Sequence, residues 1–181
     1  CDAFGILPAI SKLNPNQAMY HFISGYTAKV AGTERGITEP QATFSPCYGG
    51  PFLTLHPLVY AELLKEKIKK FNVPVYLVNT GWIGGSANSG AKRISIKFTR
   101  KMITAILDNK ISKAKYTEDS IFGLDIPLNL EGIPDKVLNP RQMWSNKSKY
   151  DLKALNLANL FKKNFEKYGD SLKHLKEFGP K

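Results

Sequence analysis

The chain has 181 residues, of which 43% are hydrophobic, and a formal net charge of +11. This length suits one domain or a large part of one, with one substantial core. The apolar runs are far too short to span a membrane and no signal peptide is evident, so we expect a cytoplasmic protein. Two cysteines can form neither a disulfide scaffold nor the ligand set of a zinc site, so we expect free thiols at Cys1 and Cys47.

The positive charge raises nucleic-acid binding as one hypothesis, because a basic face can hold a phosphate backbone. Only four of the 26 basic residues are arginines: Arg35, Arg93, Arg100 and Arg141. Nucleic-acid recognition usually depends on the two-pronged hydrogen bonding of arginine. Most lysines instead follow the outer faces of amphipathic segments, as on an ordinary solvated surface. We therefore expect no nucleic-acid partner.

The first segment, Cys1-Asp2-Ala3-Phe4-Gly5, lacks an initiator methionine and has the pattern of a strand that runs into a turn. We expect the chain to be the C-terminal piece of a longer protein. Asn14-Pro15-Asn16-Gln17 then predicts a helix start, and the helix is expected to end near Ser24-Gly25. Its apolar face comprises Met19, Phe22 and Ile23.

The run from Ala31 to Thr43 has few large apolar groups, two glycines and a proline, so it predicts a long loop. Loops of this length are either functional covers or disordered. A turn is expected at residues 47–51, and His56-Pro57 opens a helix that leads into a strand at residues 75–78. The apolar positions of that helix are Leu58, Val59, Leu63, Leu64, Ile68 and Phe71.

Residues 79–93 form a glycine-rich loop after a buried strand, Val75 to Val78. Its glycines allow the backbone to approach a ligand closely, and Lys92 and Arg93 supply donors for anionic oxygens. The loop is not a Walker A sequence, because Ala91 stands where the lysine should be and Arg93 where a serine or threonine would bind magnesium. A surface hairpin and a nucleotide contact both remain open from this pattern.

Ile94 and Ile96 alternate with polar neighbours, as in a half-buried strand, and Thr99 is a suitable N-cap for a helix that follows. That helix should bury Met102, Ile103, Ile106 and Leu107.

Residues 116–145 contain three prolines and short apolar pieces, which predicts an extended excursion over the surface. A final helix is expected from Asp151 to Tyr168, with a buried face made of Leu152, Leu155, Leu160, Phe161 and Phe165. Strands that alternate with helices predict an α/β fold.

Several of these segments together resemble ATP-dependent phosphoenolpyruvate carboxykinase. The likeness is carried by Phe4-Gly5-Ile6-Leu7-Pro8, by the run from Tyr20 to Lys29, by Ala31 to Pro40, by Asn79-Thr80-Gly81-Trp82, and by Lys92-Arg93-Ile94. It continues through Leu138-Asn139-Pro140-Arg141 and the segment 164–168, and so covers nearly the whole chain.

The resemblance implies that residues 1–181 are the C-terminal part of a mixed-sheet, mononucleotide-binding catalytic domain. The complete enzyme would convert oxaloacetate and ATP to phosphoenolpyruvate, ADP and carbon dioxide in gluconeogenesis. It would use Mg²⁺ with ATP and Mn²⁺ at a second site. The family's kinase loop, metal ligands and N-terminal domain would lie upstream, so the 181-residue chain alone is predicted to be inactive and to hold no metal.

By position, the resemblance assigns ATP contacts to Arg93, Ile94 and Thr99, and an adenine-pocket aromatic to Phe52. Arg93 could donate to phosphate, Ile94 could pack on the purine, and Thr99 would offer a hydroxyl at a helix start. The competing interpretation is that Arg93 forms a surface ion pair and Thr99 only caps its helix.

The run of about 31–44 matches the family's mobile active-site lid, which excludes water from a reactive enolate. Its central residues are Gly32, Thr33, Glu34, Arg35 and Gly36. A disordered crossing loop is the alternative interpretation of this run.

Two further alternatives follow from the residues themselves. His21 and His56 could act as acid–base groups, but each lies near a predicted helix end without a matched partner, which favours structural roles. At the level of the chain, the rival to an enzyme is a non-catalytic nucleotide- or polyanion-binding module with a basic surface.

Overall fold

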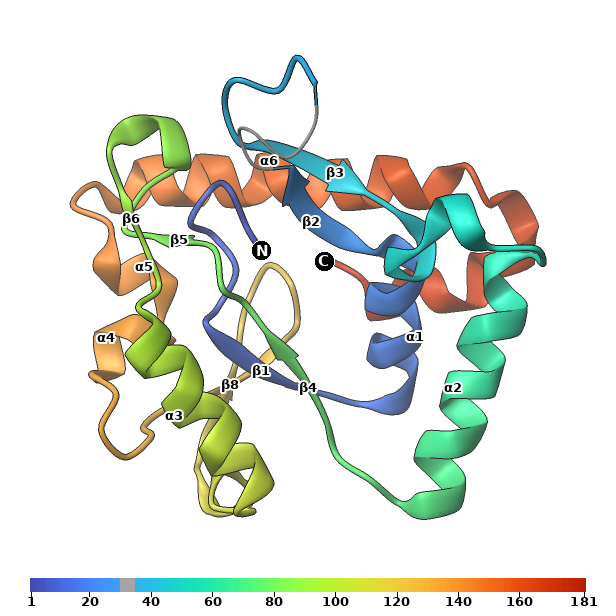
Figure 1. Ribbon diagram of the computed structural model, residues 1–181, viewed down its shortest axis with the longest axis horizontal. Coiled ribbons are helices and arrows are strands. Elements are labelled where there is room, and N and C mark those ends of the chain that lie inside the picture. The colour runs from blue at the N-terminus through green and yellow to red at the C-terminus, as the bar shows by residue number, and fades with distance from the viewer. Residues whose placement is uncertain (30–34) are drawn as a thin grey trace.

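The computed structural model describes residues 1–29 and 35–181, in which helices surround a four-stranded sheet (Figure 1). The strand order is β4-β1-β8-β7. These strands are β1 (Ile10–Leu13), β4 (Val75–Val78), β7 (Tyr116–Glu118) and β8 (Asp125–Pro127). Helix and sheet combine as the α/β prediction requires. All pairings within this sheet are antiparallel, so a mixed sheet is not found among the described strands.

Helices cover both faces of the sheet. One face carries α1 (Pro15–Ser24), α2 (Pro57–Phe71) and α6 (Lys147–Glu166), and the other carries α3 (Ile96–Leu107), α4 (Asp135–Leu138) and α5 (Pro140–Met143). The strand β4 lies between the two resulting cores. Val75 and Leu77 pack into the first core, whereas Tyr76 and Val78 pack into the second, which is the two-residue alternation of a strand. The predicted strand is confirmed, although its residues are half-buried at the edge of the described sheet.

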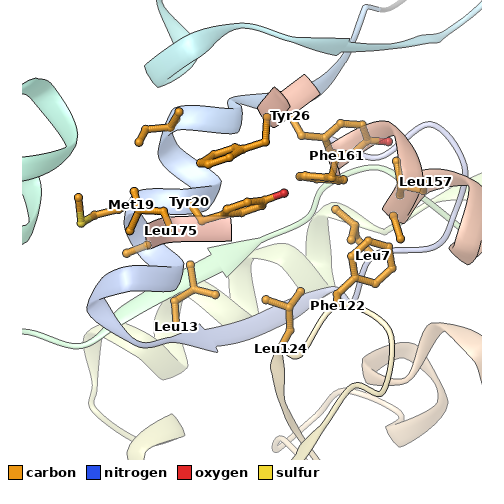
Figure 2. Packing of buried hydrophobic residues seen from close by; sticks show 14 of the residues in the cluster. Leu7, Leu13, Met19, Tyr20, Tyr26, Phe122, Leu124, Leu157, Phe161 and Leu175 are labelled. Carbon is orange, nitrogen blue, oxygen red and sulfur yellow. The ribbon is translucent and has the colours of Figure 1, made fainter. Parts of the chain in front are cut away.

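The larger core lies where α1 and α6 meet the sheet, and it is rich in aromatic rings (Figure 2). The ring of Phe161 lies 5.0 Å from that of Tyr26 and 5.1 Å from that of Phe44, measured between centroids. Tyr20 stacks on Phe165 with centroids 4.4 Å apart. These rings bring an early helix, a hairpin and the last long helix into a single core, which stabilises their relative positions.

The helix α1 begins and ends as predicted. The side chain of Asn14 accepts hydrogen bonds from the backbone N–H groups of Asn16 and Gln17, and the side chain of Gln17 accepts one from the N–H of Asn14 in return. This reciprocal capping satisfies donors that a helix start leaves unpaired. Gly25 follows the last turn with φ of +53°, a left-handed conformation that favours glycine.

The helix α2 starts at Pro57 as predicted, and its buried face is narrower than expected. Ala61 and Ile68 are buried. Three of the apolar positions expected inside are exposed: Val59, Leu63 and Phe71. The sequence pattern therefore identified the helix correctly and overestimated how much of it is covered in this chain.

Two hairpins stand outside the main sheet. In the first, β2 (Tyr26–Lys29) pairs with β3 (Gln41–Phe44), and in the second β5 (Trp82–Ile83) pairs with β6 (Lys92–Arg93). The predicted loop from 31 to 43 was therefore too long, because its last residues form β3. The pairing of Tyr26 with Phe44 places two aromatic rings at the larger core, which gives this short strand its support.

Short 3₁₀ turns join several of these elements, including the turn predicted near residue 47. They span Pro46–Tyr48, Gly50–Phe52, Ala87–Ser89, Ile111–Lys113 and Gly169–Phe178. Among the described residues, no helix combines the length and the apolar character that crossing a membrane requires.

The segment 116–145 is part of the core and not a surface excursion. Its strands β7 and β8 extend the main sheet, with β8 beside β1. Phe122 and Leu124 are almost fully buried in the larger core, and Ile126 is buried in the second. The prediction was wrong because strands of three residues are too short to show a clear alternation in the sequence.

The final helix α6 was predicted from Asp151 to Tyr168 and runs from Lys147 to Glu166, and its buried face also differs from the prediction. Phe161 and Phe165 are buried as expected, whereas Leu152, Leu155 and Leu160 are exposed. The face that packs on the core also includes Tyr150, Ala154, Leu157 and Ala158. Small alanines permit this close packing, so the apolar stripe cannot be found from large side chains alone.

Phe161 and its neighbour Leu160 provide a direct test of this packing. We expect Phe161→Ala to lower the free energy of unfolding by about 3–5 kcal/mol, because it leaves a cavity among four aromatic rings. Leu160→Ala should cost less than about 1 kcal/mol, since that side chain is 41% exposed. Chemical denaturation of the 181-residue chain measures both. Equal losses would contradict the observed face of α6.

Candidate functional site

A fully buried carboxylate organises the loops around the predicted nucleotide contacts. The Asp2 carboxylate accepts hydrogen bonds from the backbone N–H groups of Phe4, Ile6 and Leu7, at 2.9, 2.6 and 2.9 Å, and from the hydroxyl of Tyr26 at 2.7 Å. These donors replace the water that a buried carboxylate loses. Burial and the adjacent Asp2 carboxylate raise the pKa of Tyr26 far above its usual value, so the phenol keeps its proton and remains a donor.

The buried amide of Asn79 connects this carboxylate loop to the end of β4. Its Oδ1 accepts from the N–H of Asp2 at 3.0 Å and from that of Gly81 at 2.8 Å, while its Nδ2 donates to the carbonyl of Leu7 at 3.0 Å. The N–H of Trp82 also donates to the Asp2 carbonyl at 3.0 Å. A Cβ at Gly81 would collide with the Asp2 backbone, so only glycine allows this approach.

The glycine-rich loop uses one of its glycines for contact with the protein itself. Gly5 has φ of +69°, and its backbone lies close to the Gly85 carbonyl. A Cβ at Gly5 would clash with that carbonyl oxygen. The N–H of Ala87 donates to the Ala3 carbonyl at 2.8 Å. Gly90, with φ of +76°, faces open space. From the sequence, these glycines were expected to let the backbone approach a ligand. At Gly85 the close approach is instead to the backbone of Gly5, within the protein itself.

Arg93 lies at the end of β6 with its guanidinium exposed and held on two sides. Its Nε donates to the Thr80 carbonyl at 3.0 Å, and its guanidinium carbon lies 5.3 Å from the centroid of the Trp82 ring. Its Nη2 is 3.8 Å from the Cys1 sulfur. The surface ion pair considered as an alternative does not form among the described residues. Stacking and one backbone contact orient the fork and leave further N–H groups for an anion.

Residues 94–97 were expected to form a strand, but α3 begins at Ile96. Ser95 is the N-cap of α3, and its hydroxyl accepts from the N–H of Phe98 at 3.2 Å. Thr99 therefore lies one turn inside the helix, where its hydroxyl donates to the Ser95 carbonyl at 3.4 Å. The assignment of Thr99 as N-cap was wrong because Ser95 is an equally suitable capping residue and comes first.

Ile94 is 4% exposed and packs in the second core with Met102. Its side chain thus anchors the start of α3, and its N–H donates to the Gly81 carbonyl at 2.8 Å. Ile96 is exposed, in contrast to the predicted strand pattern. The helix α3 buries Met102 and Ala105 and leaves Ile103 and Leu107 exposed, so its predicted apolar face was only partly right.

Phe52 is not gathered with Arg93. It is 87% exposed at the end of the 3₁₀ turn Gly50–Phe52. Figure 1 shows the segment that leads into α2 on the right of the molecule and the β5–β6 hairpin on the left. The structure thus places Arg93, Ile94 and Thr99 in one region and Phe52 in another.

Most of the predicted lid residues, Gly32, Thr33 and Glu34, lie outside the described residues. Arg35 and Gly36 lie in an exposed turn before β3. The side chain of Asn88, in the glycine-rich loop, donates to a carboxylate oxygen of Glu39 at 2.5 Å. The base of the predicted lid therefore touches the loop that leads to Arg93.

The described residues offer cations for phosphate more readily than ligands for a metal. Lys92 and Arg93 are adjacent and exposed on β6. No group of three histidine, cysteine or acidic side chains that could hold a metal ion occurs in the part of the chain that the structure describes. Cys1 and Cys47 are both free, and burial raises the pKa of the Cys47 thiol, which lowers its reactivity.

Both histidines considered as acid–base groups have structural surroundings. Nδ1 of His56 accepts from the N–H of Leu58 at 3.3 Å and so caps α2. His21 is buried among aromatic rings, and burial lowers its pKa to about 4. Its Nε2 has no hydrogen-bond partner among the described residues. A neutral His21 is therefore part of the core.

Three residues that position Arg93 were not singled out from the sequence: Asp2, Tyr26 and Trp82. The available signal was the short spacing between Asp2 and the turn Phe4-Gly5, since an aspartate before a glycine turn often accepts nearby backbone N–H groups. The long-range partners, Tyr26 and Asn79, leave no such local pattern.

The buried state of His21 predicts a pH dependence of stability. The folded pKa of about 4 is below the unfolded value near 6.5, so the contribution is complete above pH 6.5 and is lost as the pH falls toward 4. The expected loss over this range is about 3 kcal/mol. In His21→Gln this part of the dependence should disappear, whereas the exposed His174→Gln should keep it. Denaturant midpoints between pH 7 and pH 4 measure the difference, and identical slopes in all three proteins would refute it.

Comparison with known proteins identifies the family. The family model described as phosphoenolpyruvate carboxykinase matches residues 1–136. Proteins named phosphoenolpyruvate carboxykinase (ATP) from Caldanaerobacter subterraneus subsp. tengcongensis and Staphylococcus aureus strain Newman are each 54% identical to the chain, over 180 and 178 residues. The matches cover 99% and 98% of this chain but 34% and 33% of those proteins, so the chain spans about a third of their length. The chain belongs to the ATP-dependent phosphoenolpyruvate carboxykinase family.

Proposed function

We propose that this chain is the C-terminal part of the catalytic domain of an ATP-dependent phosphoenolpyruvate carboxykinase and supplies nucleotide contacts and the active-site lid. The complete enzyme converts oxaloacetate and ATP to phosphoenolpyruvate, ADP and carbon dioxide, in cytoplasmic gluconeogenesis. The strands that make the sheet mixed come from the rest of the domain. The observation that carries this proposal is the oriented, exposed guanidinium of Arg93 beside a glycine-rich loop.

The residues of this chain act on the nucleotide by position and charge. Arg93 is fixed by Thr80 and Trp82, so little side-chain freedom is lost when its remaining N–H groups bind phosphate oxygens. Lys92 adds a neighbouring point charge. The buried side chain of Ile94 anchors the backbone at the start of α3, next to Lys92 and Arg93, and Thr99 lies in the first turns of the same helix. Phe52 lies in another region of this chain, so it could contact the adenine only if the rest of the complete enzyme positions the nucleotide base near Phe52.

The reaction also needs groups that these residues do not provide. Loss of carbon dioxide from oxaloacetate leaves an enolate, whose oxygen takes the γ-phosphoryl group of ATP and releases ADP. Mg²⁺ and Mn²⁺ would supply charge stabilisation when bound. By the chain's likeness to the family, we expect the metal ligands to lie upstream of it, and we expect the 181-residue chain alone to be inactive.

The run of about 31–44 is proposed as the lid. Two observations support this proposal. The strand β3 of the β2–β3 hairpin forms the end of the run, and Glu39 accepts a hydrogen bond from Asn88. The hairpin attaches the lid firmly to the larger core, while the contact brings its base to the glycine-rich loop. A lid in this place would cover the phosphates held at Arg93 and exclude water from the enolate.

ATP-dependent release of carbon dioxide from oxaloacetate tests the function. The natural polypeptide that contains this chain should release carbon dioxide with ATP, Mg²⁺ and Mn²⁺ and should do so poorly with GTP. If the polypeptide binds nucleotide but releases no carbon dioxide, the proposal is wrong and the protein is a non-catalytic nucleotide-binding module. In that case, binding that falls steeply with added salt would point to general polyanion binding.

Arg93→Ala in the complete enzyme should raise the KM for ATP roughly tenfold, the loss expected for one charge-assisted hydrogen bond, with a smaller effect on the KM for oxaloacetate. Arg93→Lys should recover part of the loss, because it restores the charge without the planar fork. Lys163→Ala, an exposed lysine on α6, is the matched control. Equal effects on both substrates would count against the assignment of Arg93 to ATP.

Deletion of Gly32 to Pro40 should leave nucleotide affinity nearly unchanged, because Arg93 and its supports remain. Turnover should fall, and a larger fraction of oxaloacetate should leave as pyruvate, since water reaches the enolate. The deletion ends before β3, so the pairing of Tyr26 with Phe44 can persist. Product ratios measured by coupled assays decide the outcome. Unchanged turnover and unchanged products would exclude a lid in this run.

A further inference from the structure

A second basic surface lies away from Arg93, in a hollow of about 480 Å³. One wall is the middle and second half of α3, and a second is the 3₁₀ turn Ile111–Lys113 that follows this helix. The third wall is the loop 129–131, after β8. The volume lies in the range of small-molecule sites, and the walls come from three separate segments.

Cations dominate this hollow. Four of its lining residues are basic: Arg100, Lys101, Lys110 and Lys113. The only acidic residue that lines it is Glu131. The ammonium of Lys110 lies 3.4 Å from the carboxylate of Asp108. No ion pair or side-chain hydrogen bond is found for the other three cations among the described residues, so an anion could bind them without breaking an existing ion pair.

The floor of the hollow is apolar and well supported. Ala105 and Leu130 are each 8% exposed and belong to the second core. Ile111, 1% exposed, fixes the 3₁₀ turn that carries Lys113. Thr104 also lines the hollow and carries a hydroxyl that can donate a hydrogen bond. The backbone that presents the cations is therefore anchored in the core, although the cationic side chains themselves are exposed.

Most of the hollow lies beyond Arg93 along α3, although its residue Arg100 directly follows Thr99 in the chain. Arg93 precedes α3, whereas Lys110 and Lys113 follow it. A helix of 12 residues is roughly 18 Å long, so Lys110 and Lys113 lie beyond the opposite end of α3 from Arg93, whereas Arg100 and Lys101 lie between them. Figure 1 shows the β5–β6 hairpin above the start of α3 and the connection toward β7 below its end.

We propose that this hollow binds a small anion with two or more phosphate groups. The cations come from α3, from the residues after it and from the 3₁₀ turn, and a diphosphate or triphosphate has more oxygens than a single phosphate with which to accept from Arg100 and the lysines together. The concave, three-walled shape favours a small ligand over the backbone of a long nucleic acid. Free polyphosphate and the polyphosphate of a nucleotide share this chemistry.

Lysine acylation of the complete protein, without divalent metal, tests the site directly. Tripolyphosphate should protect Lys101, Lys110 and Lys113 from acetic anhydride, as read by mass spectrometry, and should leave the exposed Lys163 unprotected. ADP in a parallel sample distinguishes the sources, because protection by tripolyphosphate alone assigns free polyphosphate and protection by both includes nucleotides. Absent protection, protection equal to that of Lys163, or protection by duplex DNA alone would overturn the proposal.

Paired variants measure the affinity. In Lys101→Glu/Lys113→Glu the dissociation constant for tripolyphosphate at this site should rise roughly tenfold or more, as expected when charge-assisted hydrogen bonds are lost. The milder Lys101→Gln/Lys113→Gln should show the same direction, and Lys163→Glu/Lys173→Glu should have no effect. Arg93→Ala should also leave this site intact, so failure of the proposed function and failure of this site give different results. Unchanged affinity in both variants of the hollow would overturn the proposal.

Discussion

The arrangement of the candidate site depends on one buried carboxylate. The charge of the Asp2 carboxylate is satisfied by three backbone N–H groups and one phenol. A buried charge of this kind tolerates little movement, because each lost donor exposes an oxygen to apolar surroundings. Asn79 and Trp82 bond to the backbone of the same residue, so the constraint continues into the β5–β6 hairpin and reaches Arg93. The surface guanidinium is thus positioned from the interior.

Elements with strong local signals could be predicted from the sequence. The start of α1 is determined by Asn14 and Gln17, which satisfy each other's backbone groups, and its end by Gly25. The strand β4 was recognised from four consecutive β-branched and aromatic residues. The adjacent Lys92 and Arg93 are exposed, as expected of donors for an anion, although they form strand β6 of a hairpin and not part of a loop. In each case the determining contacts lie within a few residues in sequence.

Features that depend on distant partners could not be predicted in the same way. The strand β8 pairs with β1, more than a hundred residues earlier, and β7 joins the sheet by pairing with β8. The buried face of α6 is decided by how closely Ala154 and Ala158 approach the core, which no list of large apolar residues reveals. The start of α3 was ambiguous because Ser95 and Thr99 can both cap a helix. The buried position of the Asp2 carboxylate depends on the hydrogen bond from Tyr26, a residue 24 positions later in the chain.

The stacking of Tyr20 on Phe165 has a consequence for how the protein is made. A ribosome releases α1 well before α6, so the aromatic face of α1 must wait for about 140 further residues before its partner emerges. Trp144 and Tyr150 reach back in the same way to the carbonyls of Gly5 and Ile6. Contacts of such long sequence separation form late. The nascent chain therefore carries an uncovered aromatic surface until α6 emerges, and chaperones that hold apolar segments could bind this surface.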